Sequence, residues 1–223
     1  MHELINEFRS TEHLISIEVE NVVLEGNLHL PENAIGLIVF VHGSGSSRHS
    51  PRNQYVANFL NKSGFGTFLF DLLTEKEEAL DIHTASLRFN IELLTQRVIG
   101  TTKQLSTKEE TADLPIGYFG ASTGAAAALR AAARIPELVG AIVSRGGRPD
   151  LAGPEMCSVQ APTLLIVGGS DLEVIKLNQE ALKMLPGKKN LEIVIGAGHL
   201  FEEPGSLERV ALLARDWFKE HLD

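Results

Sequence analysis

The sequence is poor in cysteine, in positive charge and in long apolar runs, and each shortage excludes a class of protein. Its single cysteine, Cys157, allows no disulfide within the chain and fits a reducing compartment. The 29 acidic residues outnumber the 20 basic ones, and the net charge of -9 repels nucleic-acid phosphates and anionic membranes. No apolar run approaches the roughly 20 residues that a membrane-spanning helix needs. We therefore expect neither nucleic acid nor a membrane as a partner.

Motifs for metals, nucleotides and secretion are also missing. The eight histidines are scattered and no H-E-x-x-H occurs, so we expect no metal site. There is no P-loop, and the dinucleotide-like pattern that begins at Gly43 and Gly45 is broken by Arg48. The polar N-terminus MHELINEFRSTEH lacks the apolar core of a signal peptide, which makes the cytoplasm the default location. The expected chemistry thus uses side chains alone, without a cofactor.

The chain does contain a regular alternation of strand and helix patterns. With 43% hydrophobic and 22% charged residues, its 223 residues suit a single compact domain over residues 1–223. The pattern predicts an antiparallel strand pair at 15–20 and 22–30, strands at 36–41, 66–70, 138–144, 163–167 and 191–195, helices at 51–63, 86–105, 173–185 and 206–222, and a loop at 71–81. This order predicts an α/β fold, a three-layer α/β/α sandwich with a mostly parallel sheet.

The stretch LPIGYFGASTGAAAAL at 114–129 contains the candidate nucleophile. It is typical of a short strand, a sharp turn at Ser122 and an alanine-rich helix. A serine on such a strained turn needs neighbours without bulk, which Gly120 and Gly124 provide. The helix that follows directs its N-terminal amides at developing negative charge. This G-x-S-x-G pattern predicts that Ser122 attacks the substrate, and a chance match of five residues is the alternative.

A base and an orienting acid are expected to follow later strands at the same sheet edge. A serine hydroxyl becomes a good nucleophile when a base removes its proton and a carboxylate orients that base. His199 follows the predicted strand 191–195 through a glycine-rich loop, and Asp171 follows the strand 163–167. Their alternatives are a surface histidine and a helix N-cap, with Glu173 as the nearest substitute acid. Asp71 also follows a predicted strand, but it precedes the elbow in the chain and fits the triad order less well. The chain order Ser122, Asp171, His199 is that of the α/β-hydrolase triad.

The oxyanion of the intermediate needs two backbone amides. By position one is the amide of Thr123, directly after the nucleophile. The other should come from the loop HGSGSS after strand 36–41, and we choose Ser44. In the same loop, His42 is interpreted as a structural residue that braces the loop rather than as a second base.

Two arginines follow the predicted strand 138–144 at the same edge. For Arg145 and Arg148 we favour ion pairing with Asp150 or Glu155. The sharper hypothesis is that one of them binds a substrate carboxylate, because a guanidinium matches the geometry of that group.

With these residues in place, the chain resembles the α/β-hydrolase family and, within it, the dienelactone-hydrolase-like branch. The resemblance runs from VFVHGSGSS through GASTG and VGGSD to GAGHLF. It implies an eight-stranded sheet whose first strands are antiparallel, and hydrolysis through an acyl-enzyme. Dienelactone hydrolases proper carry cysteine at the elbow, where this chain has Ser122. We therefore expect a general carboxylesterase rather than a lactone-specific enzyme.

The size of the site can also be predicted. Only 18 residues, 145–162, separate two predicted strands, so a large cap domain cannot fit there. We expect an open site for small or soluble esters as the small-molecule partner. The alternatives are hydrolysis of lactones or thioesters, or acyl transfer, by the same triad. An alternative of another class is a hydrolase-like fold that serves as a non-catalytic binding module.

Overall fold

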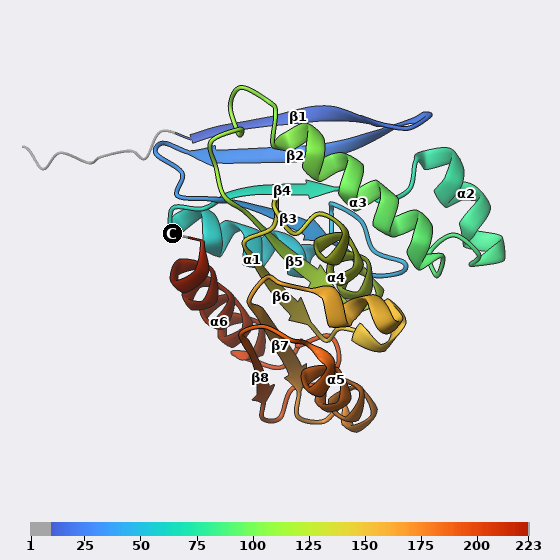
Figure 1. Cartoon of the computed structure of the whole chain (residues 1–223), viewed down its shortest axis with the longest axis vertical. Helices are drawn as coiled ribbons and strands as arrows, with labels where there is room; N and C mark the ends of the chain where they lie inside the picture. The colour runs from blue at the N-terminus through green and yellow to red at the C-terminus, as the bar shows by residue number, and fades with distance from the viewer. Residues whose placement is uncertain (1–9, 223) are drawn as a thin grey trace, which may run out of the picture.

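A computed structural model describes residues 10–222, and its centre is one eight-stranded sheet (Figure 1). The strands lie in the order β1-β2-β4-β3-β5-β6-β7-β8. Their bounds are β1 Ser10–Val19, β2 Val22–Pro31, β3 Leu37–Val41, β4 Gly66–Phe70, β5 Ile116–Ala121, β6 Ala141–Arg145, β7 Thr163–Gly168 and β8 Lys189–Val194. β2 pairs antiparallel with β1 and β4, and the other neighbours are parallel. The expected mostly parallel sheet with antiparallel first strands is confirmed.

Helices cover both faces of this sheet. They are α1 Pro51–Lys62, α2 Glu75–Thr84, α3 Ile91–Leu105, α4 Thr123–Arg134, α5 Leu172–Met184 and α6 Ser206–His221, with a 3-10 segment η1 at Pro149–Ser158. α1 and α6 pack on one face, whereas α3 and α4 pack on the other (Figure 1). Strands β3 to β7 are buried along their whole length, as expected of parallel strands covered on both faces. The three-layer α/β/α sandwich is therefore confirmed.

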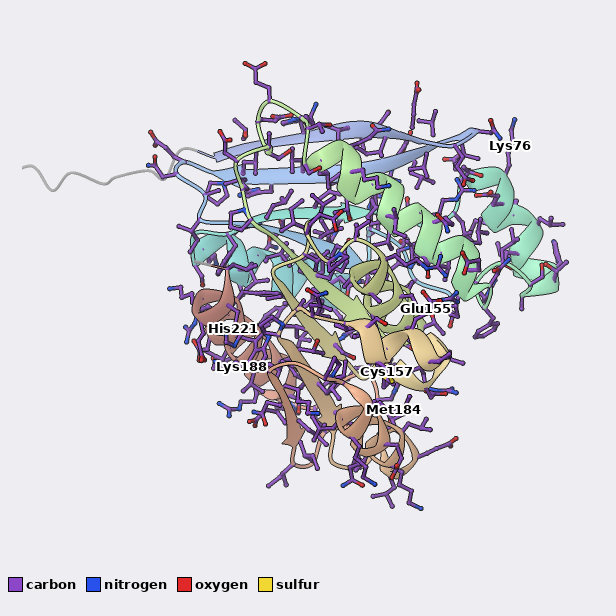
Figure 2. All side chains as sticks on the ribbon, viewed as in Figure 1. Lys76, Glu155, Cys157, Met184, Lys188 and His221 are labelled. Carbon is purple, nitrogen blue, oxygen red and sulfur yellow. The ribbon has the colours of Figure 1, made fainter. Side chains whose placement is uncertain are left out.

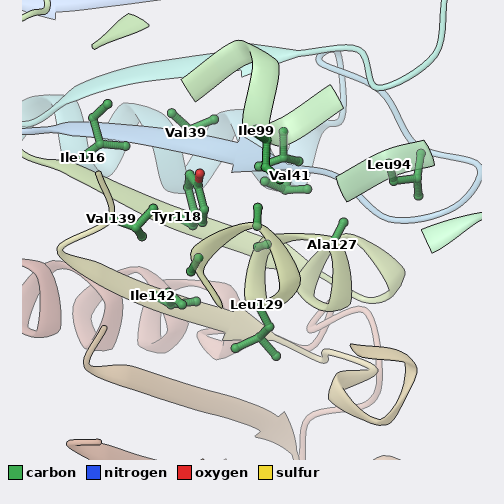
Figure 3. Close-up of a cluster of buried hydrophobic side chains, with 14 of the residues drawn as sticks. Val39, Val41, Leu94, Ile99, Ile116, Tyr118, Ala127, Leu129, Val139 and Ile142 are labelled. Carbon is green, nitrogen blue, oxygen red and sulfur yellow. The ribbon is translucent and has the colours of Figure 1, made fainter. Parts of the chain in front are cut away.

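The core between the sheet and α3 and α4 fixes the position of the elbow helix. Figure 3 shows Val39 and Tyr118 on the strands facing Ile99 on α3 and Ala127 on α4. The alanine-rich face of α4 lets its backbone approach the sheet closely, because no long side chain stands between them. The hydroxyls of Tyr118 and Thr102 share a hydrogen bond of 2.6 Å, which satisfies both groups inside this core.

The expected loop at 71–81 is wrong, because α2 occupies most of it. Thr74 is the N-cap: its hydroxyl accepts from the amide of Glu77 at 3.2 Å, and the Glu77 carboxylate accepts from the amide of Thr74 at 2.8 Å. This capping box, with acidic residues in the first turn, starts a helix that has little apolar periodicity. The acidic composition predicted a solvated loop, but the spacing of Thr74 and Glu77 was the signal for a helix.

The predicted helix at 86–105 begins later than expected, at Ile91. Asp81, at the end of α2, accepts hydrogen bonds from the amides of Leu87 and Arg88 and from the Arg88 side chain. These bonds hold residues 85–90 as a turn between α2 and α3.

Within residues 10–222, no helix is both long and apolar enough to cross a membrane.

Candidate active site

Ser122 lies on a strained turn between β5 and α4, with φ of 49° and ψ of -122°. The turn is possible because a Cβ on Gly120 would lie 2.6 Å from the Cα of Ala125, and one on Gly124 would lie 2.2 Å from the carbonyl oxygen of Val41. Only glycine fits such close backbone approaches. The amide of Ser122 donates to the carbonyl of Arg145 at 3.2 Å, which ties the turn to β6.

Asp171 and His199 meet at the carboxyl ends of β7 and β8. The Nδ1 atom of His199 lies 2.7 Å from Oδ2 of Asp171. The two loops can approach because a Cβ on Gly168 would lie 2.4 Å from the carbonyl oxygen of Gly198. Asp171 is the N-cap residue of α5, yet its side chain makes no capping bond and points to the imidazole instead. Of the acids considered from the sequence, Asp171 is the one paired with His199, whereas Asp71 pairs with Arg48.

Ser122 and His199 contact the same short loop after β6. A Cβ on Gly146 would lie 3.5 Å from Cε1 of His199 and 3.1 Å from its carbonyl oxygen. Gly146 directly follows Arg145, whose carbonyl accepts the amide of Ser122. The tertiary structure thus brings the elbow and the imidazole to one place. Within the described residues, the Ser122 hydroxyl itself makes no hydrogen bond.

The loop after β3 also contacts the turn that holds Ser122. Its residues 43–46 form a turn in which the amide of Ser46 donates to the carbonyl of Gly43 at 3.2 Å. A Cβ on Gly43 would lie 2.9 Å from Cβ of Ser122, so glycine allows the loop to reach the nucleophile. The Ser44 amide, expected to bind the oxyanion, donates to the hydroxyl of Thr123 at 2.9 Å.

His42 braces this loop, as expected from the sequence. Its ring accepts the amide of Leu72 at Nε2, 3.1 Å away, and its Nδ1 lies 2.9 Å from the carbonyl of Gly43. The accepting Nε2 assigns the proton to Nδ1, so the ring is neutral. Burial lowers the pKa of His42 below its ordinary value.

The pKa of His42 leads to a prediction on acid stability. As pH falls below 6.5, the unfolded chain binds a proton at His42 before the folded protein does. The free energy of unfolding should therefore fall, by at most about 1.4 kcal/mol per pH unit from this group. The variant His42→Gln keeps an acceptor for Leu72 but cannot titrate, so its loss between pH 7.5 and 5 should be smaller. Urea unfolding at several pH values measures both, and equal slopes would contradict the assignment.

Arg148 forms the ion pair that we favoured from the sequence. Its Nε and Nη2 atoms donate to the two carboxylate oxygens of Asp150 at 2.9 and 2.8 Å. Glu155, which lies within η1 and is labelled in Figure 2, instead accepts from Arg130 and Arg134. Figure 2 also labels Cys157, whose exposed thiol lies on the same segment.

The ion pair that we favoured for Arg145 is wrong: this residue is buried and has no carboxylate partner among residues 10–222. Its Nη2 donates to Oδ1 of Asn53 at 3.4 Å, and its Nε and Nη1 have no partner. Burial, and then the charge of nearby Arg52, lower the pKa of Arg145 to about 10. The unpaired nitrogens are shielded from solvent, so the guanidinium is not presented to a ligand in this conformation.

A cavity of about 600 Å³ lies next to the loop after β3. One wall is formed by that loop and the start of α1, including Ser46, His49 and Arg52, and the other by Leu73, Ala79 and Ile82. The second wall belongs to α2 and the segment before it. The sequence did not predict this cavity because no helix was expected at residues 71–81.

Among the residues described, no group of three or more His, Cys, Asp or Glu side chains could hold a metal ion.

Comparisons with known proteins give relatives for nearly the whole chain, although no protein-family model matches it. Proteins from two strains of Mycobacterium tuberculosis, each named "Putative phosphoribosyl transferase", are 59% identical over 201 residues. The match covers 90% of this chain and 44% of each relative. The chain therefore spans less than half the length of these curated relatives.

Solved structures match this chain along nearly the full length of both aligned chains. A dienelactone hydrolase from Anabaena variabilis is 54% identical, with a TM-score of 0.95, and the alignment covers 96% of this chain and 99% of that one. Est1E from Butyrivibrio proteoclasticus has a TM-score of 0.76 at 14% identity, covering 93% and 98%, which shows a shared fold. With more than half of its aligned residues shared with the Anabaena protein, the chain belongs to the dienelactone hydrolase family of α/β-hydrolases.

Proposed function

We propose that the protein is a serine hydrolase that cleaves carboxylic esters of small or soluble substrates through an acyl-enzyme. The observation that carries this proposal is the 2.7 Å contact of His199 with Asp171, beside the loop that holds Ser122. A nucleophile on a strained elbow, a base next to it and an acid that orients the base are the parts that acyl transfer requires. The family membership supports the same class of reaction.

The first chemical step joins Ser122 to the substrate. Nε2 of His199 takes the hydroxyl proton while Oγ of Ser122 bonds to the carbonyl carbon, and the C=O electron pair moves to the oxygen. Asp171 keeps the proton of His199 on Nδ1, which leaves Nε2 free as the base, and stabilises the imidazolium that forms. The intermediate then collapses, its C–O bond breaks, and the leaving alcohol takes the proton from His199. Water hydrolyses the acyl-enzyme by the same steps.

The contact between the Ser122 hydroxyl and His199 is assigned to the substrate complex. The His199 side chain is 40% exposed, so its ring can adjust when a substrate displaces water. Catalytic hydrogen bonds are often long in the free enzyme and shorten when the substrate binds. The Asp171 carboxylate, 17% exposed, keeps the imidazole near the elbow in the meantime.

Ser122, Asp171 and His199 do not line the cavity beside α2, but the loop after β3 lines it and also reaches Ser122 through Gly43. We assign this cavity to the part of a modest-sized substrate that extends away from the reacting carbonyl. The polar wall of the cavity, with Ser46, His49 and Arg52, suits a soluble ester, and Leu73 and Ile82 offer apolar contact on the other side. The segment between β6 and β7 contains η1 rather than a separate cap. Lactones and thioesters remain alternative substrates for the same residues, and the named activity of the Anabaena relative favours including lactones in any test.

The name of the Mycobacterium relatives does not carry a function to this chain. It describes proteins of which the matched region is 44%. The residues that we propose as the triad, Ser122, His199 and Asp171, are suited to acyl transfer. The same arrangement argues against a non-catalytic binding module, which would need no oriented base next to a strained serine.

A fluorophosphonate probe and a panel of esters test the proposal. The purified protein should react covalently with the probe at Ser122, as mapped by mass spectrometry, and should hydrolyse p-nitrophenyl acetate. Dihydrocoumarin and an acetyl thioester, offered in parallel, decide between ester, lactone and thioester. The variant Cys157→Ser is the control for reaction at the exposed thiol and should label as fully as the unchanged protein. Absence of labelling and of hydrolysis would favour the binding module.

A further inference from the structure

The hydroxyl of Thr123 lies against the amide that was expected to bind the oxyanion. We propose that Thr123 stabilises the oxyanion with two donors, its backbone amide and its hydroxyl, and that the Ser44 amide acts indirectly by polarising this hydroxyl. The inference rests on the proposed serine hydrolase function and names a further catalytic group at that site.

The Ser44 amide is directed at Thr123 by the conformation of its loop. The turn at residues 43–46 uses the carbonyl of Gly43 and the amide of Ser46, with Gly45 in the left-handed region at φ of 67°. This leaves the Ser44 amide free of partners within the loop, and it donates to Oγ1 of Thr123 at 2.9 Å. The Ser44 proton is therefore already engaged before a substrate oxygen arrives.

The hydroxyl of Thr123 has a proton left to give. Its Oγ1 accepts from Ser44, and within residues 10–222 neither its hydroxyl nor its amide donates to any protein group. Thr123 is 4% exposed, so few water molecules can reach the side chain. A buried hydroxyl with an unused proton, directly after the candidate nucleophile, points to an acceptor that is present only during the reaction.

The position of this hydroxyl is fixed by contacts that allow little movement. Gly124 holds the start of α4 against the end of β3, since its Cβ would lie 2.2 and 2.3 Å from the carbonyl oxygens of Val41 and His42. Gly43 holds the other side of the site against Ser122. Donors that are held in place before the reaction stabilise developing charge at little reorganisation cost.

The amide and the hydroxyl of one threonine can donate to the same oxygen because both lie close together on that residue. When Oγ of Ser122 attacks, the carbonyl oxygen gains the electron pair of the broken π bond and accepts both hydrogen bonds. The Ser44 amide, by donating to Oγ1, makes the hydroxyl proton a stronger donor through the chain of hydrogen bonds. The proton of Thr123 stays on Oγ1 throughout, and the proton of Ser122 moves to His199.

A different interpretation is that the hydroxyl is a latch. In that case, the Thr123 hydroxyl blocks the Ser44 amide until a substrate carbonyl displaces it, and removal of the hydroxyl would expose a better donor. The two interpretations predict opposite effects of the same substitution, because valine has nearly the shape of threonine but carries no hydroxyl.

The test compares Thr123→Val with Thr123→Ser on p-nitrophenyl acetate. Thr123→Val should lower kcat about 100-fold with little change in KM, which is typical of the loss of one oxyanion donor. Thr123→Ser keeps the hydroxyl and should stay within about threefold of the unchanged protein. Unaltered or higher activity of Thr123→Val would overturn the proposal in favour of the latch. Thr101→Val is the matched control, because that buried hydroxyl in α3 has no hydrogen-bond partner.

A second measurement separates this inference from the proposed function and from misfolding. A trifluoromethyl ketone that adds to Ser122 forms a tetrahedral adduct, and its inhibition constant should rise about 100-fold in Thr123→Val while the melting temperature stays near that of Thr101→Val. If Thr123→Val leaves both inhibition and hydrolysis unchanged, the role of the hydroxyl is refuted, but the serine hydrolase function is not. An unchanged protein that neither hydrolyses the ester nor binds the ketone refutes the serine hydrolase and this proposal together.

Discussion

Replacement of Ser122 by alanine is expected to lower kcat for p-nitrophenyl acetate by about 10⁴-fold or more, as removal of a nucleophile does in serine hydrolases. The loss should be this large because Ser122 is the one residue between β5 and α4, and the adjacent hydroxyl of Thr123 is bound to the Ser44 amide. Fluorophosphonate labelling should disappear at the same time. Stopped-flow or plate assays of the purified variant measure the rate, and intact-mass spectrometry measures the labelling.

A second substitution shows whether Ser122 and His199 act as one unit. The double variant Ser122→Ala, His199→Ala should be no slower than the single Ser122→Ala, because the base has no role once its partner is gone. Ser144→Ala is the control: it makes the same change to a buried serine on the neighbouring strand, whose hydroxyl has no partner in the described part. Full activity of Ser122→Ala would disprove the proposed mechanism, and full activity of Ser144→Ala would show that the effect is specific.

Replacement of Gly124 by alanine is expected to lower the free energy of unfolding by about 2–4 kcal/mol, as severe overpacking does. The added Cβ would lie 2.2 Å from the carbonyl oxygen of Val41 and 2.3 Å from that of His42. Both contacts are to backbone, so the first turn of α4 must move away from β3. A displacement of about 1 Å at the elbow should also cost about 100-fold in kcat.

Gly100→Ala is the comparison for this effect. Gly100 is also a helical glycine, in α3, and a Cβ there would lie 2.5 Å from Cγ1 of Val19, a side-chain atom at the end of β1. Its loss of stability should be smaller, because a side chain on an outer strand can shift and alanine favours helix over glycine by about 1 kcal/mol. Urea unfolding measures both variants. An equal or larger loss in Gly100→Ala would contradict the backbone clash as the cause.

The sequence was most informative where backbone geometry alone decides the structure. The strained turn at Ser122 needs glycine two residues before and two residues after it. The spacing of Gly120, Ser122 and Gly124 therefore predicted both a strand end and a helix start. The buried runs predicted β3 to β7 in the same way, because a strand covered on both faces must be apolar throughout. The sequence was least informative at α2, where a capping box and a buried carboxylate at Asp81 replace the apolar periodicity on which the prediction depended.

The sequence by itself determined the candidates for the proposed chemistry: a serine at the turn between a strand and a helix, and an acid and a histidine after later strands. Only the tertiary structure decided that Asp171 is the acid that contacts His199, that Arg148 is bound to Asp150, and that the Ser44 amide donates to a side chain. The reason is that turns and strands follow from neighbouring residues. A pairing between loops far apart in the chain depends instead on how the sheet and its helices pack.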